Sequence, residues 1–215
     1  MSVRRKGRPN SNGTQSVGPD TLIEAVCELL KTLPPEKISR AVVARAANVD
    51  PTLIRYYFRN NHSLLRATAV ALSQRFQQLA DSAIEPDAPT EVRLRTRIET
   101  FLRFQTTYPF YHRLMIEELW GSGDEEARAL LHQVSSRGAA GYQHIINAGV
   151  TKGEMRAVDP FLFHLCIIGF VEVASIGRPI LLANAHPAAN SPMYVSVIAD
   201  FLTDLLVNGL KARWK

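Results

Sequence analysis

Residues 38–58 decide the fold of this chain, and they read ISRAVVARAANVDPTLIRYYF. Ser39 and Asp50 each carry a side-chain oxygen that can cap a helix N-terminus. Pro51 stands at the first position of the second helix, where its missing N–H costs nothing. A turn at Asn48 separates the two helical stretches. The segment therefore predicts two short helices joined by a tight turn.

Apolar residues at helical spacing continue on both sides of this segment. Before it, Asp20 is a candidate N-cap of a helix that prolines end near residue 34; after it, Asn60 is a candidate cap of a helix over residues 61–82. Further helices are expected over residues 90–108, 110–119, 124–152, 159–182 and 191–213, with Gly, Pro or Asn at the breaks. The pattern predicts an all-α protein in which an N-terminal three-helix helix-turn-helix precedes a C-terminal helical bundle.

The chain divides by composition into residues 1–19, 20–66 and 67–215. The first part is polar and basic, so it is expected to be a flexible arm. Residues 1–66 contain 11 Lys or Arg and 5 Asp or Glu, whereas residues 67–215 contain 14 and 15. Positive charge concentrated at one end of the chain favours binding to a polyanion such as DNA, because neutralising its phosphates releases the counterions condensed on them.

Several classes of protein are disfavoured by the composition. The basic N-terminus lacks the apolar segment of a secretory signal, and residues 161–176 are too short to span a bilayer, which needs about 20 apolar residues. Cys27 and Cys166 form no disulfide framework and are expected to be core thiols in a reducing compartment. We expect a cytoplasmic protein without membrane contact, catalytic residues, metal or cofactor.

The run from Ile38 to Phe58, followed by Asn60, Asn61, His62 and Leu64-Leu65, resembles the DNA-binding segment of the TetR family of transcriptional regulators. The resemblance covers about residues 20–70, and the rest of the chain agrees only in its helical plan and length. It implies a regulator, not an enzyme, that binds double-stranded operator DNA as a homodimer. It also implies that residues 67–215 bind an unidentified small-molecule effector and form the dimer.

The resemblance implies that residues 50–57 are the recognition helix. Pro51, Thr52, Arg55 and Tyr56 fall where the family contacts bases or the adjacent backbone. The Arg55 guanidinium can form two hydrogen bonds with guanine O6 and N7, which makes it the leading candidate for reading sequence. The alternative is a solvated surface arginine.

Other residues are assigned to the phosphate backbone by the same resemblance. Ser39 and Arg40 open a helix whose N-terminus favours an anion, although Ser39 also has a simple capping role. Tyr57 falls at a phosphate-binding position, with packing as the alternative. The chain departs from the family at Ala41, which cannot make a polar base contact, and at Asn61, which replaces a common phosphate-binding lysine.

The arm contains the run Lys6-Gly7-Arg8-Pro9, which resembles the core of a minor-groove AT-hook. Lys6 and Arg8 are therefore candidate DNA contacts, and the alternative is a tail attracted to DNA only by its charge.

An aromatic group over residues 101–120 suggests where the effector binds. The expected cavity is bounded by Phe104, Tyr108, Tyr111, Met115 and Phe170, and the alternative is an ordinary packed core. The last two helices are apolar on more than one face, which favours pairing with a second subunit. The predicted function is a repressor released from a palindromic operator by a mostly apolar effector; the alternative is a regulator whose bundle docks proteins and has no ligand.

Overall fold

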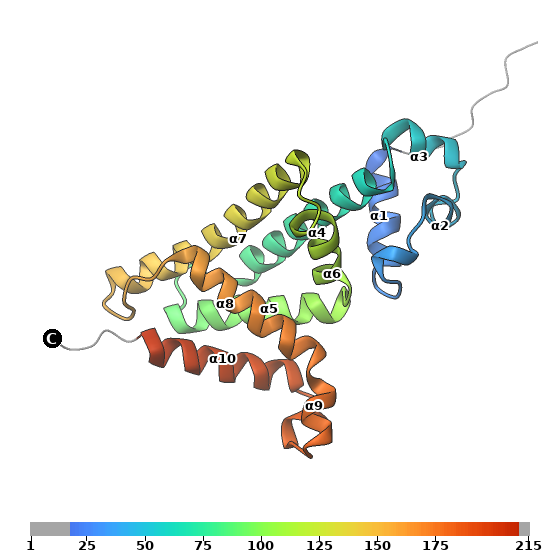
Figure 1. The fold of residues 1–215 in the computed structure, drawn as a ribbon. Helices are drawn as coiled ribbons and strands as arrows, with labels where there is room; N and C mark the ends of the chain where they lie inside the picture. Colours follow the sequence, from blue (N-terminus) through green and yellow to red (C-terminus); the bar gives the residue numbers. More distant parts are fainter. Residues whose placement is uncertain (1–17, 211–215) are drawn as a thin grey trace, which may run out of the picture.

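The computed structural model describes residues 18–210, and every regular element within them is helical (Figure 1). The elements are α1 (Pro19–Leu29), η1 (Pro35–Lys37), α2 (Arg40–Ala46), α3 (Pro51–Tyr57), α4 (Asn61–Ala83), α5 (Thr90–Thr107), α6 (Tyr111–Met115), η2 (Ile116–Trp120), α7 (Glu125–Thr151), α8 (Pro160–Ile176), α9 (Arg178–Ala183), η3 (Pro187–Asn190) and α10 (Tyr194–Leu210). The expected all-α class is confirmed.

Capping residues set the limits of the N-terminal helices. The Asp50 carboxylate accepts a hydrogen bond of 2.7 Å from the Thr52 N–H and so begins α3. Ser39 caps α2 as expected, through a longer contact of 3.4 Å. Asp20 was expected to cap the first helix, but the N-cap is Gly18, because Pro19 takes the first helical position and α1 begins two residues earlier than expected.

α4 is one continuous helix of 23 residues that belongs to both parts of the protein. It begins with a reciprocal capping box, in which Asn60 and Ser63 bond each other's backbone N–H. Its first turns pack against α1, and the remainder lies along α5 and α7 (Figure 1). The expected boundary between residues 66 and 67 therefore falls inside a helix.

The C-terminal helices differ from the expected ones at two places. The helix expected over residues 159–182 is broken at Gly177, because Pro179 lacks an N–H and its ring obstructs the preceding turn. The last helix begins at Tyr194 rather than residue 191, since Pro192 lies in the turn before it. η2 extends α6 as one turn of π-helix, a form often found at functional sites.

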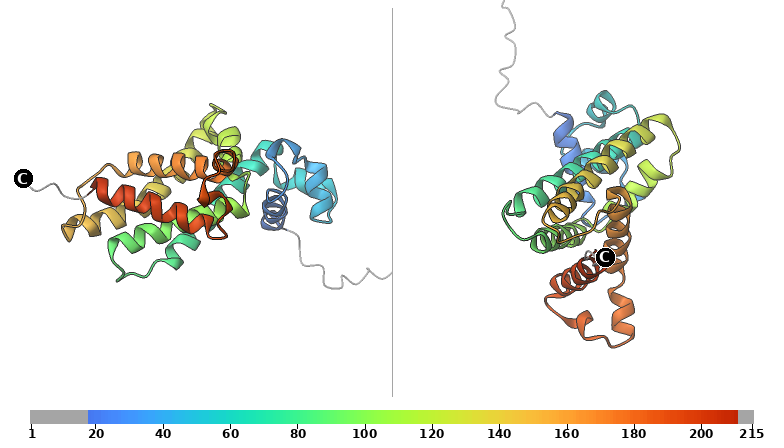
Figure 2. Two further views of the ribbon diagram at one scale, coloured as in Figure 1. Left: turned by 90° about the horizontal axis from the view of Figure 1, so that it is seen from below. Right: turned by 90° about the vertical axis from the view of Figure 1, so that its left-hand side faces the viewer.

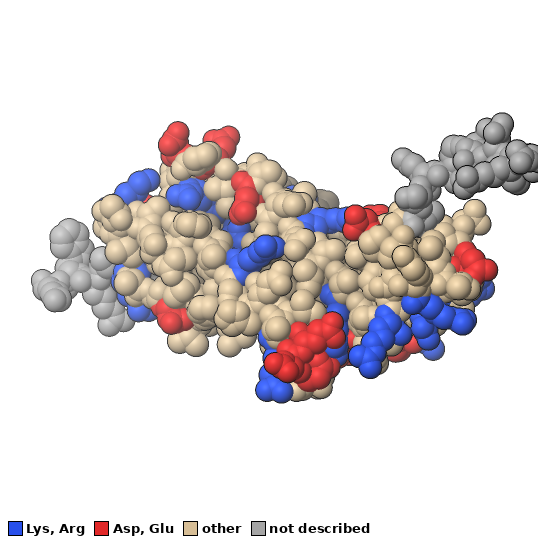
Figure 3. All heavy atoms as spheres, turned by 90° about the horizontal axis from the view of Figure 1, so that it is seen from above, with Lys and Arg blue, Asp and Glu red and all other residues tan. Residues whose placement is uncertain are grey.

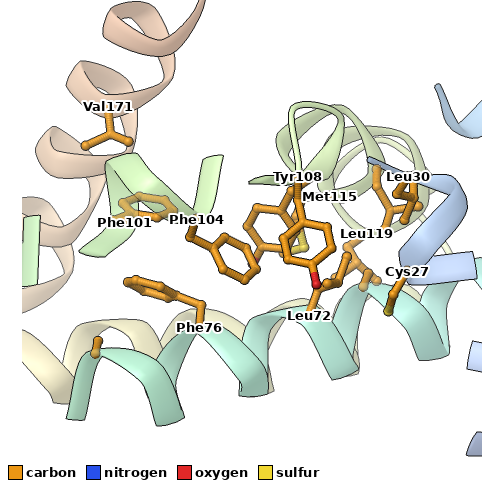
Figure 4. Close-up of a cluster of buried hydrophobic side chains, with 14 of the residues drawn as sticks. Cys27, Leu30, Leu72, Phe76, Phe101, Phe104, Tyr108, Met115, Leu119 and Val171 are labelled. Atoms are coloured by element: carbon orange, nitrogen blue, oxygen red, sulfur yellow. The ribbon is translucent and has the colours of Figure 1, made fainter. Parts of the chain in front are cut away.

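One hydrophobic core joins the two parts of the molecule. Figure 4 shows Phe76, Phe101 and Phe104 facing one another, and the same cluster continues to Cys27 and Leu30 on α1. The rings of Phe76 and Phe101 have centroids 4.7 Å apart. The core of the bundle therefore continues into the core of the helix-turn-helix. The helix-turn-helix lies at one end of an elongated molecule (Figure 2).

Among residues 18–210, no helix combines the length and apolarity needed to cross a membrane.

Candidate nucleic-acid interface and effector cavity

The outer face of α3 carries the polar side chains that the sequence assigned to base recognition. Pro51, Thr52, Arg55 and Tyr56 are all exposed, and Tyr56 is 80% exposed. Ile54 on the opposite face is fully buried and holds the helix against the domain. Hydrogen bonds from Thr52 keep the pKa of Asp50 below its usual value, so the cap stays ionised. The structure thus brings four candidate base-reading residues onto one exposed surface.

The candidate phosphate contacts have more varied surroundings. Ser39 is exposed and Arg40 is half-buried at the start of α2, while Tyr57 is 38% exposed and meets the Tyr56 ring edge-on at 5.0 Å. The Asn61 amide donates a hydrogen bond of 2.9 Å to the carbonyl oxygen of Ile38. Asn61 therefore fastens the loop before α2 to α4. Lys6 and Arg8, the candidate DNA contacts of the arm, lie outside the described residues.

Positive charge is concentrated near this surface. Figure 3 shows Lys and Arg side chains gathered at the end of the molecule that carries α1–α3. Lys37, Arg45, Arg55 and Arg59 are exposed there. The basic excess seen in the sequence therefore lies on the same end as the α3 face, as binding to a phosphate backbone requires.

An apolar cavity of about 380 Å³, partly open to the surface, is bounded by α4, α5, α6, η2, α7 and α8. Its walls include Phe76, Phe101, Trp120 and Ile168, and its polar groups include Ser73 and His164. A volume in this range and a mostly apolar lining are typical of small-molecule sites. The bundle is therefore not solidly packed.

Two of the five predicted lining residues face this cavity. Tyr111 and Met115 are part of its wall. Phe104 and Tyr108 are instead packed behind it, with ring centroids 4.9 Å apart, and Phe170 stacks on Phe201 at 6.2 Å. Periodicity identifies the buried face of a helix, but it does not distinguish a side chain that packs on a cavity from one that lines it.

Two histidines lie in the cavity wall, although no local pattern in the sequence predicts a role for them. His112 packs edge-on against Trp120 at 5.2 Å, and its Nδ1 lies 3.5 Å from the Glu172 carboxylate. His164 lies beside Tyr142, and its Nδ1 is buried with no hydrogen-bond partner among the described residues. Burial, assisted by the nearby Arg97 cation, lowers the pKa of His164 to about 4.

The low pKa of His164 predicts a specific acid sensitivity. As the pH falls from 6.5 to about 4, His164 takes up a proton in the unfolded chain but not in the folded one. Stability is therefore lost across this interval, by at most about 1.4 kcal/mol per pH unit from this residue. His164→Gln should flatten the pH dependence measured by urea unfolding, whereas His132→Gln, at an exposed position on the same bundle, should not. Equal slopes in all three proteins would contradict the assignment.

The segment formed by α6 and η2 contacts both the cavity and the DNA-binding end. Tyr111, Met115 and Trp120 face the cavity. On its other side, Arg113 pairs with Glu36 of η1 at 2.9 Å, and the buried Glu118 carboxylate lies 3.0 Å from His62 in the first turn of α4. The segment therefore connects the wall of the cavity to the base of the helix-turn-helix.

Arg66 ties α4 to this segment. Its Nε donates to the Glu118 carbonyl oxygen at 3.2 Å, and its guanidinium pairs with Asp124 and, at 2.9 Å, with Glu126. Burial raises the pKa of Glu118 above its usual value, and the neighbouring His62 and Arg66 offset only part of that rise. The buried carboxylate thus depends on two basic residues of α4 for its charge compensation.

Arg66→Met should lower the free energy of unfolding by about 2 kcal/mol, because it removes several charged hydrogen bonds and leaves Glu118 poorly compensated. It should also weaken the coupling between effector and DNA. Urea unfolding measures the first effect. Arg113→Met is the matched control: its partners are exposed, so water screens the pairs and stability should change much less. Equal losses in the two variants would argue against a special role of Arg66.

Large apolar side chains are exposed on both α8 and α10. Leu165, Val173 and Ile176 on α8, and Phe201 and Leu205 on α10, are each more than half exposed. Cys166 lies on the same side of α8 and is exposed, so the expectation of a core thiol was wrong for this residue, although it was confirmed for Cys27. Exposed apolar surfaces of this kind mark interaction sites.

A helix-turn-helix with an exposed polar recognition face, mounted on a helical bundle that contains a cavity, defines the class of ligand-responsive DNA-binding regulators. A family model described as "Tetracyclin repressor-like, C-terminal domain" matches residues 84–209. The chain belongs to this family, the TetR transcriptional regulators, and is accordingly a DNA-binding regulator and not an enzyme. No curated protein matches it.

Solved structures share the fold at low sequence identity. FadR from Bacillus subtilis, solved with stearoyl-CoA, is 18% identical with a TM-score of 0.65 over 89% of this chain and 98% of its own. AibR, solved with isovaleryl coenzyme A and operator DNA, is 17% identical with a TM-score of 0.63 over 88% and 97%. FadR from Bacillus halodurans is 17% identical with a TM-score of 0.68 over 91% and 97%.

Proposed function

We propose that this protein is a cytoplasmic repressor that binds a palindromic operator as a homodimer and leaves it when a small, mostly apolar effector occupies the cavity. The observation that carries the proposal is the double contact of the α6 and η2 segment. Met115 and Trp120 face the cavity, whereas Arg113 and Glu118 contact the DNA-binding end. We infer that this segment has two positions and that the effector binds the protein more tightly in one of them. The difference between the two binding free energies is what lowers operator affinity.

The homodimer is supported by the apolar surface of α8 and α10. One face of each helix packs inward, and the exposed face is available to the same helices of a second copy, giving a four-helix isologous interface. Two copies of α3 then face successive major grooves about 34 to 36 Å apart, or a multiple of that distance, which requires a palindromic operator.

The cavity favours a small-molecule effector over a protein-docking scaffold, because a scaffold needs no internal space of 380 Å³. Two proteins of similar fold were solved with stearoyl-CoA and isovaleryl coenzyme A. The apolar chain of an acyl thioester has the chemistry that the lining of this cavity requires, so acyl compounds are the first effectors to test.

The proposal is tested with purified protein and DNA from upstream of its own gene. A gel shift should show a complex, and an effector should dissociate that complex while raising the melting temperature of the free protein. Both effects are required together, because a ligand that opposes DNA binding must bind the DNA-free state more tightly. A melting shift without loss of the DNA complex would refute effector-controlled release.

A further inference from the structure

A second cavity opens on the other side of the contact between α4 and α7. It is a groove of about 740 Å³, which we call the basic groove, lined by the C-terminal half of α4, the start of α5 and the middle of α7. Its ionisable residues are Arg93, Arg137, His144 and Asp81. Gln77 lines both this groove and the apolar cavity. The two spaces thus share this side chain at their boundary.

The basic groove has an excess of positive charge, because its arginines outnumber the carboxylates that line it. Within residues 18–210, neither Arg93 nor Arg137 forms an ion pair, and the Arg93 Nε is buried without a hydrogen-bond partner. Asp81 is the only carboxylate in the lining of the described part, and it pairs with Arg97 at 3.1 Å. Arg137 is exposed, so it is free to contact a ligand, whereas the buried Arg93 Nε is a costly unpaired donor that a partner from outside the chain would stabilise.

Arg97 adds a third cation at the boundary between the two spaces. Its side chain is fully buried between the rings of Phe76 and Tyr142, with its guanidinium carbon 5.6 and 4.9 Å from their centres. One guanidinium nitrogen donates to Gln77, and Nε has no partner. A Cβ on Gly141, which lines the groove, would come within 2.0 Å of Nη2, so the missing side chain there brings Arg97 to the groove wall.

We propose that the basic groove binds the anionic group of an amphiphilic effector whose apolar part occupies the 380 Å³ cavity. This inference rests on the proposed function and specifies the class of effector: an acyl chain joined to a carboxylate or a phosphate ester. Arg93 and Arg137 bind the anion as charged donors, which form the stronger class of hydrogen bond. A ligand passing from one space to the other displaces the Gln77 side chain and frees Arg97 to bond the anion.

Four probes test the inference by isothermal calorimetry: palmitoyl-CoA, coenzyme A, palmitic acid and its uncharged methyl ester. Arg93→Gln and Arg137→Gln should each raise the dissociation constant of an anionic acyl probe by about tenfold or more, the effect of losing a charged hydrogen bond. The methyl ester should bind all variants equally. Arg128→Gln, an exposed arginine on α7 outside both cavities, is the charge-matched control and should change nothing.

The probes also separate the two sources of anion. Weakened palmitic acid binding identifies a carboxylate as the bound group, whereas weakening confined to palmitoyl-CoA and coenzyme A identifies phosphates. Unchanged binding of every anionic probe to the groove variants, with melting temperatures like the wild type, would overturn the basic groove while leaving effector control intact. Equal weakening of the methyl ester would do the same. Failure of all four probes to bind the wild type would overturn the acyl effector itself.

Discussion

Val173→Glu and Phe201→Glu should each convert the protein from a homodimer to a monomer. Operator affinity should then fall by on the order of a thousandfold, because a dimer that binds two linked half-sites gains a factor of about 10² to 10⁴ in affinity over one half-site. Both residues lie on the exposed apolar surface of α8 and α10 and outside both cavities. A carboxylate buried at the centre of an isologous interface meets its own copy or apolar side chains and has no partner.

Light scattering and a gel shift measure the two effects. The wild type should show about twice the chain mass of 23.9 kDa, and the variants should show that mass itself. Val92→Glu is the matched control, since it puts the same charge at an exposed apolar position near the start of α5. A wild type that is monomeric at every salt concentration would refute the dimer.

Arg55→Ala should cost about 1 to 3 kcal/mol of binding free energy at each half-site and relax the preference at one base position. The reason is geometric: Arg55 is exposed on α3 beside Thr52 and Tyr56, and its guanidinium can form a two-bond contact with one guanine. In a homodimer this loss of binding free energy occurs at both half-sites. The affinity for the whole operator should therefore fall by more than the loss of one phosphate contact would cause.

Fluorescence anisotropy on operators changed one base pair at a time measures both the affinity and the preference. Arg40→Ala is the comparison, because a phosphate contact at the start of α2 should weaken all operators alike and lower the dependence of affinity on salt concentration. If Arg55→Ala binds every operator as the wild type does, α3 is not the recognition helix.

The N-terminal helices could be predicted closely because local chemistry fixes them. Asp50 followed by Pro51 begins a helix wherever it packs, and Asn60 caps α4 as expected. The prediction failed where tertiary packing decides between alternatives. Leu79 has helical spacing from the buried Leu72 and Phe76 but is 48% exposed, whereas the adjacent Ala80 is fully buried. The packed helices therefore cover a different face of α4 at this point than the spacing predicts.

The apolar cavity was predictable only in part. Aromatic residues at helical spacing suggested a cavity near residues 101–120, and Tyr111 and Met115 line the one that the structure has. The remaining walls come from α4, α7 and α8, far apart in the sequence, and no local pattern identifies Ser73 or His164 as neighbours across a cavity. The basic groove was missed for the same reason: Arg93 and Arg137 are single arginines on separate helices.

The continuity of α4 has a mechanical consequence. At 1.5 Å per residue, a helix of 23 residues is a rigid lever about 35 Å long. Its inner part borders the effector cavity through Phe76 and Gln77, and its outer end supports α1–α3. About 15 residues, or about 22 Å, separate Phe76 from the outer end of α4 at Asn61. A pivot of about 5° near the cavity therefore displaces that end by about 2 Å, which is enough to break a hydrogen bond. If an effector binds in the cavity as proposed, a small change in its volume would thus move α3 relative to the major groove.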